Sequence, residues 1–179
     1  MPRFIGFLRA VNVGKRQMKM ERLREVLTEM GLAKVETFIA SGNFSFETTA
    51  RSAAALERKI EGALEDAFGF VVETFLRTPD ELAAAAGHDA FPGQTGRVLY
   101  VGFLRDAPDA ESRKRVAALA DDLDLVAFHG REMYALTRRA PGEPSPLFSS
   151  KLDRALGGPT TMRNVNTVRK LAAKYPPAR

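Results

Sequence analysis

Cysteine is absent from the 179-residue chain, and histidine occurs only twice, as His88 and His129. The absence of cysteine excludes disulfides, thiolate catalysis and cysteine-based zinc sites. A metal site would have to consist mainly of carboxylates, and no group of Asp and Glu residues has the spacing of a metal-binding loop. We therefore expect no metal and no cofactor.

Long hydrophobic runs are also missing. None reaches the roughly 18 apolar residues of a membrane-spanning helix. The apolar run after Arg3 ends at Arg9, and it is shorter than the roughly 7–15 residues of a secretory segment. We therefore expect a cytoplasmic protein that has no membrane as a partner.

Charge of one sign is not concentrated in long blocks. The net charge is +5, from 27 basic and 22 acidic residues. The two signs are interspersed, as on a solvated surface, and no block of five or six like charges occurs. The excess of positive charge favours a nucleic acid partner only weakly.

The first half of the chain has the pattern of a ferredoxin-like unit. Apolar residues recur at helical spacing after Lys19 and again after Ser52, which is a typical helix N-cap. Short runs rich in β-branched and aromatic residues lie between and beside these helices. The order βαββαβ follows from strands at residues 3–9, 34–40, 43–48 and 70–76 and helices at 19–30 and 52–68.

The pattern restarts after a segment rich in glycine and proline. The letters Gly-Phe-Leu-Arg at residues 6–9 recur at residues 102–105, each time at the end of a half's first strand, which favours duplication. The second half reads as βαββα and ends in a helix at 164–174 in place of a fourth strand. We expect an α+β fold of two ferredoxin-like halves with an extra C-terminal helix. Its parts are residues 1–86 with a short extra helix, a linker at 87–96, and residues 97–179.

Polar loops of the first half are predicted to meet at one edge of its sheet. A right-handed crossover makes the first and second strands parallel, so the end of the first strand lies beside the turn after the second. A glycine loop with basic residues ahead of a helix can hold an anion. The alternative is that these residues form ordinary turns and solvated surface. The candidate ligand-binding residues at this edge are Arg9, Asn12, Gly14, Lys15, Ser41, Gly42 and Asn43.

A second polar cluster stands at the start of the last helix. Asn164 is predicted to cap this helix, Arg163 to face an anion, and Asn166 to lie beside them. We expect the last helix to pack back on the N-terminal half. This would bring Arg163 within about 10 Å of Asn12 or Ser41 and form a composite site, because a site needs convergent polar groups. The alternative is ordinary capping with a surface arginine.

Catalytic candidates are few. The chain has no nucleophile elbow and no evident Ser-His pair. His129 and the strand residues Glu36, Glu47 and Glu73 could act as acids or bases, but a turn histidine and outward-facing strand glutamates are more often solvated. The phenylalanines lack the aromatic signature of an RNA-binding sheet, and we expect them in the core.

Several segments together resemble a known family. They are residues 8–14 (LRAVNVG), 20–24 (MERLR), 35–43 (VETFIASGN) and 161–168 (TMRNVNTV). Their combination resembles the bacterial domain-of-unknown-function family 1697, over nearly the whole chain. The resemblance implies two related α+β halves and no established activity, substrate or cofactor. The family usually has two glycines where this chain has Gly14 followed directly by Lys15.

Three functions remain open at this point. The first is binding of a phosphate-containing ligand, a nucleotide or RNA, at the polar edge. The second is a metal-independent transferase or hydrolase, and the third is a scaffold that forms a homodimer. The placement of the family's motif residues on loops favours a binding site.

Overall fold

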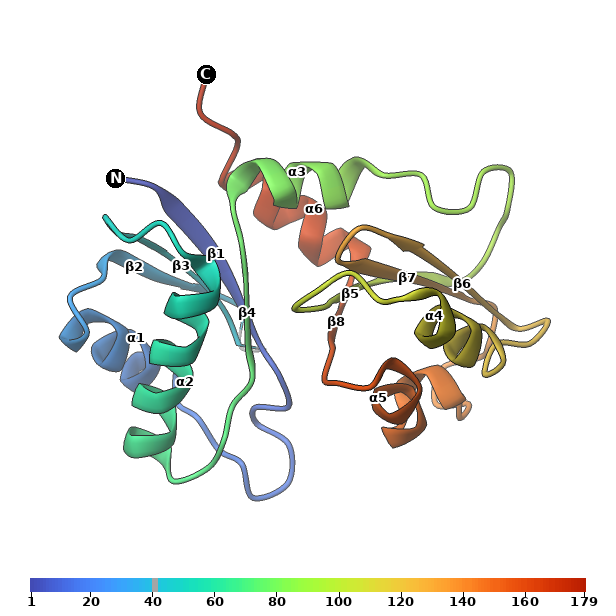
Figure 1. The fold of residues 1–179 in the computed structure, drawn as a ribbon, viewed down its shortest axis with the longest axis horizontal. Helices are drawn as coiled ribbons and strands as arrows, with labels where there is room; N and C mark the ends of the chain where they lie inside the picture. The colour runs from blue at the N-terminus through green and yellow to red at the C-terminus, as the bar shows by residue number, and fades with distance from the viewer. Residues whose placement is uncertain (40–41) are drawn as a thin grey trace. The chain divides into compact units, whose positions relative to one another are not determined.

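Two four-stranded antiparallel sheets form the framework of the computed structural model, which describes residues 1–39 and 42–179 (Figure 1). The strand orders are β2-β3-β1-β4 and β6-β7-β5-β8. Both are the order of a ferredoxin-like sheet, so the predicted fold class is confirmed. The chain divides into an N-terminal unit, Met1–Ala83 with Leu171–Arg179, and a C-terminal unit, Ala84–Lys170.

The elements follow one another in the same order in both halves. The first half contains β1 (Arg3–Leu8), α1 (Met20–Glu29), β2 (Ala33–Phe38), β3 (Asn43–Glu47), α2 (Ala53–Phe68), β4 (Thr74–Arg77) and α3 (Pro79–Gly87). The second contains β5 (Val98–Phe103), α4 (Ala110–Ala117), β6 (Asp124–His129), β7 (Glu132–Thr137), a 3-10 helix at Pro146–Phe148, α5 (Ser150–Leu156), β8 (Thr161–Asn164) and α6 (Val165–Lys174).

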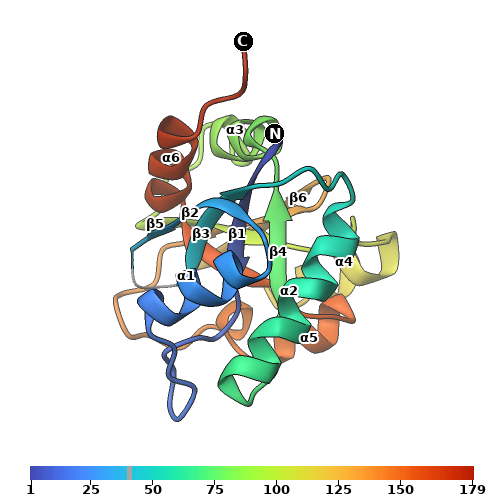
Figure 2. The same cartoon turned by 90° about the vertical axis from the view of Figure 1, so that its left-hand side faces the viewer.

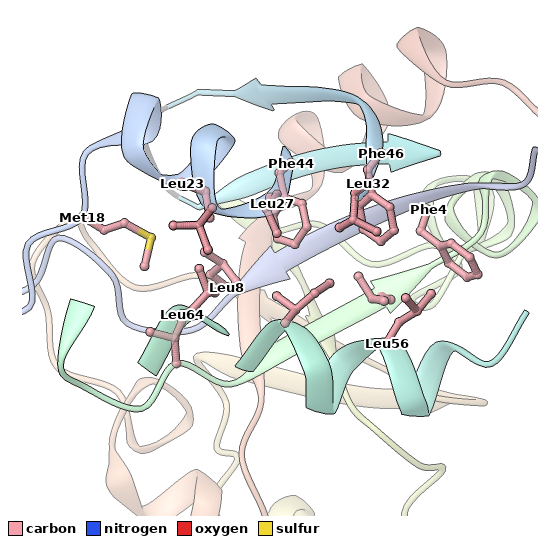
Figure 3. Packing of buried hydrophobic residues seen from close by; sticks show 14 of the residues in the cluster. Phe4, Leu8, Met18, Leu23, Leu27, Leu32, Phe44, Phe46, Leu56 and Leu64 are labelled. Atoms are coloured by element: carbon pink, nitrogen blue, oxygen red, sulfur yellow. The ribbon is translucent and has the colours of Figure 1, made fainter. Parts of the chain in front are cut away.

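The core of the N-terminal unit lies between its sheet and helices α1 and α2, which cover one face of the strands (Figure 2). Figure 3 shows aliphatic side chains of both helices meeting phenylalanines of β1 and β3. Gly6 permits this packing, because a Cβ at Gly6 would lie 2.2 Å from the ring of Phe44. The ring therefore lies directly over the backbone of β1.

The prediction that the second half lacks a fourth strand is wrong. Residues Thr161–Asn164 form β8, which pairs antiparallel with β5. The strand has only four residues and is mostly polar, so it lacks the apolar run from which a strand is usually recognised. Helix α6 therefore follows a complete βαββαβ unit, as α3 follows β4 in the first half.

Two buried arginines mark the duplication at the level of residues. Arg77 of β4 pairs with Ile5, the residue before Gly6, and Arg163 of β8 pairs with Val101, the residue before Gly102. Arg77 is 0% exposed and Arg163 is 9% exposed. Each donates from Nη1 to the carbonyl oxygen of the residue before it, at 2.8 and 2.9 Å. Each half thus has a buried arginine at the same position of its last strand, paired with the residue before the glycine of its first strand.

The last residues of the chain belong to the N-terminal unit. The Tyr175 hydroxyl donates to the Glu36 carboxylate at 2.5 Å, and the Arg3 guanidinium lies 5.0 Å from the centre of the Tyr175 ring. The division between the units falls within α3 and within α6, whereas the sequence suggested a linker at 87–96. Residues 88–97 contain neither helix nor strand.

Candidate functional site

The connection from β1 to α1 is rich in basic residues. Residues 9–19, called the basic loop below, contain Arg9, Lys15, Arg16 and Lys19 and no acidic residue. The basic loop therefore has a net charge of +4. A local charge of this size attracts anions.

Asn12 fixes the shape of the basic loop. Its Oδ1 accepts from the Met18 backbone N–H at 2.8 Å, and its own N–H donates to the Arg16 carbonyl at 2.7 Å. Asn12 and Gly14 have φ angles of 56° and 59°, in the left-handed region that Asn and Gly tolerate best. Asn12 was predicted from the sequence to bind a ligand. In the structure its side-chain oxygen instead accepts a hydrogen bond that holds the loop.

Arg16 attaches the basic loop to the segment before β4. Its guanidinium donates to the Val71 carbonyl and lies 5.0 Å from the centre of the Phe70 ring. The Nε atom of Arg16 is buried without a partner among the described residues. The contacts of Arg16 with Val71 and Phe70 therefore give it a structural role in the loop.

Lys15 and Lys19 are exposed, and their side chains make no hydrogen bond or ion pair with any described residue. Lys19 precedes α1 and provides no side-chain cap for it. The first turn of α1 thus keeps N–H groups that a ligand or water must satisfy. Sequence reasoning missed Lys19, although the charge of residues 9–19 could have identified it. Arg9 is half-buried, and its N–H donates to the Glu73 carbonyl.

The hairpin from β2 to β3 reaches the end of β1, as the sequence predicted. The Leu8 N–H donates to the Gly42 carbonyl at 2.9 Å. Gly42 has a φ of +80°, and a Cβ there would lie 2.8 Å from Val11. Asn43 is fully buried, and its Nδ2 donates to the Phe38 carbonyl at 3.1 Å. Ser41, the remaining candidate here, lies outside the described residues.

The corresponding edge of the C-terminal unit has different chemistry. Its connection from β5 to the cap of α4 contains Arg105, Asp106 and Asp109, a net charge of −1. Asp109 caps α4 by accepting from the Ser112 N–H at 2.7 Å. A cavity of about 380 Å³ lies here. With two carboxylates and an occupied helix start, this edge is poorly suited to an anion.

The candidates near the last helix lie in the C-terminal unit. Asn164 caps α6 as predicted, since its Oδ1 accepts from the Asn166 N–H at 2.9 Å. Arg163 is not a surface group, because it lies in β8 and its guanidinium donates to the Thr161 hydroxyl at 2.7 Å. Burial lowers the pKa of Arg163 to about 10, so it stays protonated at neutral pH. Its combination with Asn12 in one site stays a prediction.

Three of the four acid–base candidates have structural partners, namely Glu36, Glu47 and His129. Hydrogen bonds from Tyr175 and Lys174 lower the pKa of Glu36, and Lys34 lowers that of Glu47. A carboxyl with a lowered pKa is a weak general base at neutral pH. His129 does not stand alone, because its ring stacks on His88 with the centroids 4.0 Å apart. Within the described residues, no three His, Asp or Glu side chains are grouped to bind a metal.

The helices of residues 1–39 and 42–179 do not include one that is long and apolar enough to cross a membrane. Two sheets with the same strand order define the class of the protein as a duplicated ferredoxin-like fold, in which a basic loop follows β1. The chain belongs to the family of proteins of unknown function called DUF1697, whose model matches residues 1–134. Membership of this family, inferred above from the motifs, is confirmed.

A solved structure shares the fold over nearly the full length of both chains. It is the conserved bacterial protein SP0830 from Streptococcus pneumoniae, 24% identical, with a TM-score of 0.72. The match covers 96% of this chain and 97% of that chain. At this identity the likeness concerns the fold. No curated protein matches the chain.

Proposed function

We propose that the protein binds a phosphate-containing ligand, a nucleotide or RNA, at the basic loop of its N-terminal unit. The observation that carries the proposal is a pair of exposed lysines, Lys15 and Lys19, that have no side-chain partner among the described residues and lie on a loop with a net charge of +4. Phosphate oxygens are strong acceptors for such ammonium groups. The loop is already held in shape by Asn12, so binding would cost little ordering of the chain.

The comparison between the halves supports the choice of this edge. The C-terminal unit has the same topology, yet its equivalent connection carries a net charge of −1 and a capped helix. The positive charge is therefore not a requirement of the fold. A difference of this kind between duplicated halves is expected when one of them has a ligand to bind.

Calorimetric titration with ATP, inorganic triphosphate and a short single-stranded RNA tests the proposal. We expect saturable binding by the wild-type protein and a loss of about tenfold or more in affinity for Lys15→Ala/Lys19→Ala. Lys59→Ala is the matched control, because Lys59 is an exposed lysine of α2 in the same unit.

The dependence on salt separates the two ligand classes. RNA affinity should fall steeply as the salt concentration rises, and that of a mononucleotide should fall less. Absence of binding by all three ligands, or an equal loss in the Lys59→Ala control, would reject the proposal.

A further inference from the structure

Ile39, at the end of β2, has an unfavourable backbone conformation. Its φ is +58°, in the left-handed region. A β-branched residue is a true outlier there, because its Cβ crowds the backbone. The Ile39 side chain is also 55% exposed, so it gains little from burial in return. Strain of this kind clusters at functional sites.

The hairpin of the C-terminal unit also has a left-handed residue directly after its first strand. β2 ends at Phe38 and β6 ends at His129, so the residue after each strand is Ile39 and Gly130. Gly130 has a φ of +57°, nearly the same as that of Ile39. Glycine adopts this conformation without strain. The two connections differ in length, because Phe38 pairs with Asn43 across four residues and His129 pairs with Glu132 across two. The C-terminal unit thus has glycine at its left-handed position, whereas the N-terminal unit has a strained isoleucine.

Ile39 belongs to the edge that carries the basic loop. The same hairpin contacts the end of β1 through the hydrogen bond between Leu8 and Gly42 and through the approach of Gly42 to Val11. Val13, within the basic loop, is a second exposed aliphatic residue, at 63%. This edge thus combines lysines that have no partner among the described residues with isolated aliphatic side chains on loops.

We propose that Ile39 is a specificity-determining residue that contacts the base of a nucleoside phosphate, free or within single-stranded RNA. This inference rests on the proposed function and deepens it. A phosphate group alone would gain nothing from an aliphatic side chain, whereas a planar base has an apolar face that can pack against one. The lysines hold the phosphates, and Ile39 distinguishes a nucleotide from a bare polyphosphate.

The experiment compares the affinities for ATP and for inorganic triphosphate, which share the phosphates and differ in the nucleoside. The wild-type protein should prefer ATP by about tenfold, the scale of one base contact. Ile39→Gly and Ile39→Asn should remove this preference and leave the triphosphate affinity unchanged. Both variants should melt at or above the wild-type temperature, because both residues tolerate a positive φ. Leu123→Ala, at an exposed leucine of the C-terminal unit, is the control.

The outcomes separate this inference from the proposed function. If Lys15→Ala weakens both ligands but the preference for ATP persists in both Ile39 variants, Ile39 is not a base contact and the proposed function stands. Binding of neither ligand by the wild-type protein would overturn both. A lower melting temperature in both variants would show that Ile39 has a folding role and would also overturn the inference. If the bound base belongs to single-stranded RNA, the same variants should also bind a short oligoadenylate more weakly than the wild-type protein does.

Discussion

Gly6 and Gly102 provide a matched pair for testing how the core of the N-terminal unit is packed. They occupy the same position in β1 and β5, one residue before the repeated Phe-Leu-Arg. A Cβ at Gly6 would meet three atoms of the Phe44 ring at 2.2 to 2.7 Å. A Cβ at Gly102 would meet the Thr160 hydroxyl at 3.3 Å and the Met133 Cβ at 3.5 Å.

We expect Gly6→Ala to destabilise the protein by about 2 kcal/mol, within the range for overpacking of a well-packed core. The Phe44 ring is fully buried and stacks on Phe46, with the centroids 5.9 Å apart, so it cannot move away freely. Gly102→Ala should change stability by less than about 0.5 kcal/mol, because the loss of glycine entropy in the unfolded chain offsets the close contacts.

Urea unfolding followed by circular dichroism at 222 nm measures the difference. With a slope of about 2 kcal/mol/M, Gly6→Ala should lower the midpoint of the N-terminal unit's transition by about 1 M. Gly6→Ala/Phe44→Leu should recover part of this loss, because the smaller side chain makes room for the methyl group. Equal midpoints for the two alanine variants would show that the ring does not constrain Gly6, and the reasoning would be refuted.

Three further changes test other contacts, all by urea or thermal unfolding. Gly42→Ala should cost about 2 kcal/mol, since it combines a φ of +80° with a close approach to Val11; a loss below 0.5 kcal/mol would contradict this. Asp124→Ala should cost about 2 kcal/mol by leaving the donors of the buried Asp124 carboxylate unpaired. Burial acts to raise the pKa of Asp124, but hydrogen bonds from Arg139, Ser145 and Thr137 together outweigh it, so the pKa lies below its usual value. The carboxylate's contribution to stability is therefore complete above the unfolded pKa and is lost as the pH falls through the folded pKa; an acid limb unchanged in Asp124→Asn would contradict this. Tyr175→Phe should cost about 1 kcal/mol by removing the hydrogen bond to Glu36, and an unchanged midpoint would show that this bond contributes nothing.

Elements with strong local patterns could be predicted from the sequence. The apolar spacing after Lys19 and the Ser52 cap led to α1 and α2 within a residue or so of their observed bounds. The phenylalanines at 44 and 46 were assigned to the core because alternation places them on one face, and both are fully buried. The duplication was visible as four repeated letters. Local propensity and periodicity act over neighbouring residues, so they are present in the sequence itself.

The tertiary structure decided what depends on distant partners. Residues 161–164 form β8 because they pair with β5. Their own sequence is mostly polar and does not indicate a strand. Arg163 is buried because it lies in that strand. The strand pairing also shows that Arg163 and Arg77 occupy equivalent positions in the two halves. For the candidate site, the sequence supplied the basic residues and the glycine turns. Only the structure distinguished Arg16, which holds the loop, from Lys15 and Lys19, which contact no partner in the part of the chain that the structure describes. The direction of a side chain depends on segments far along the chain, which the sequence does not place.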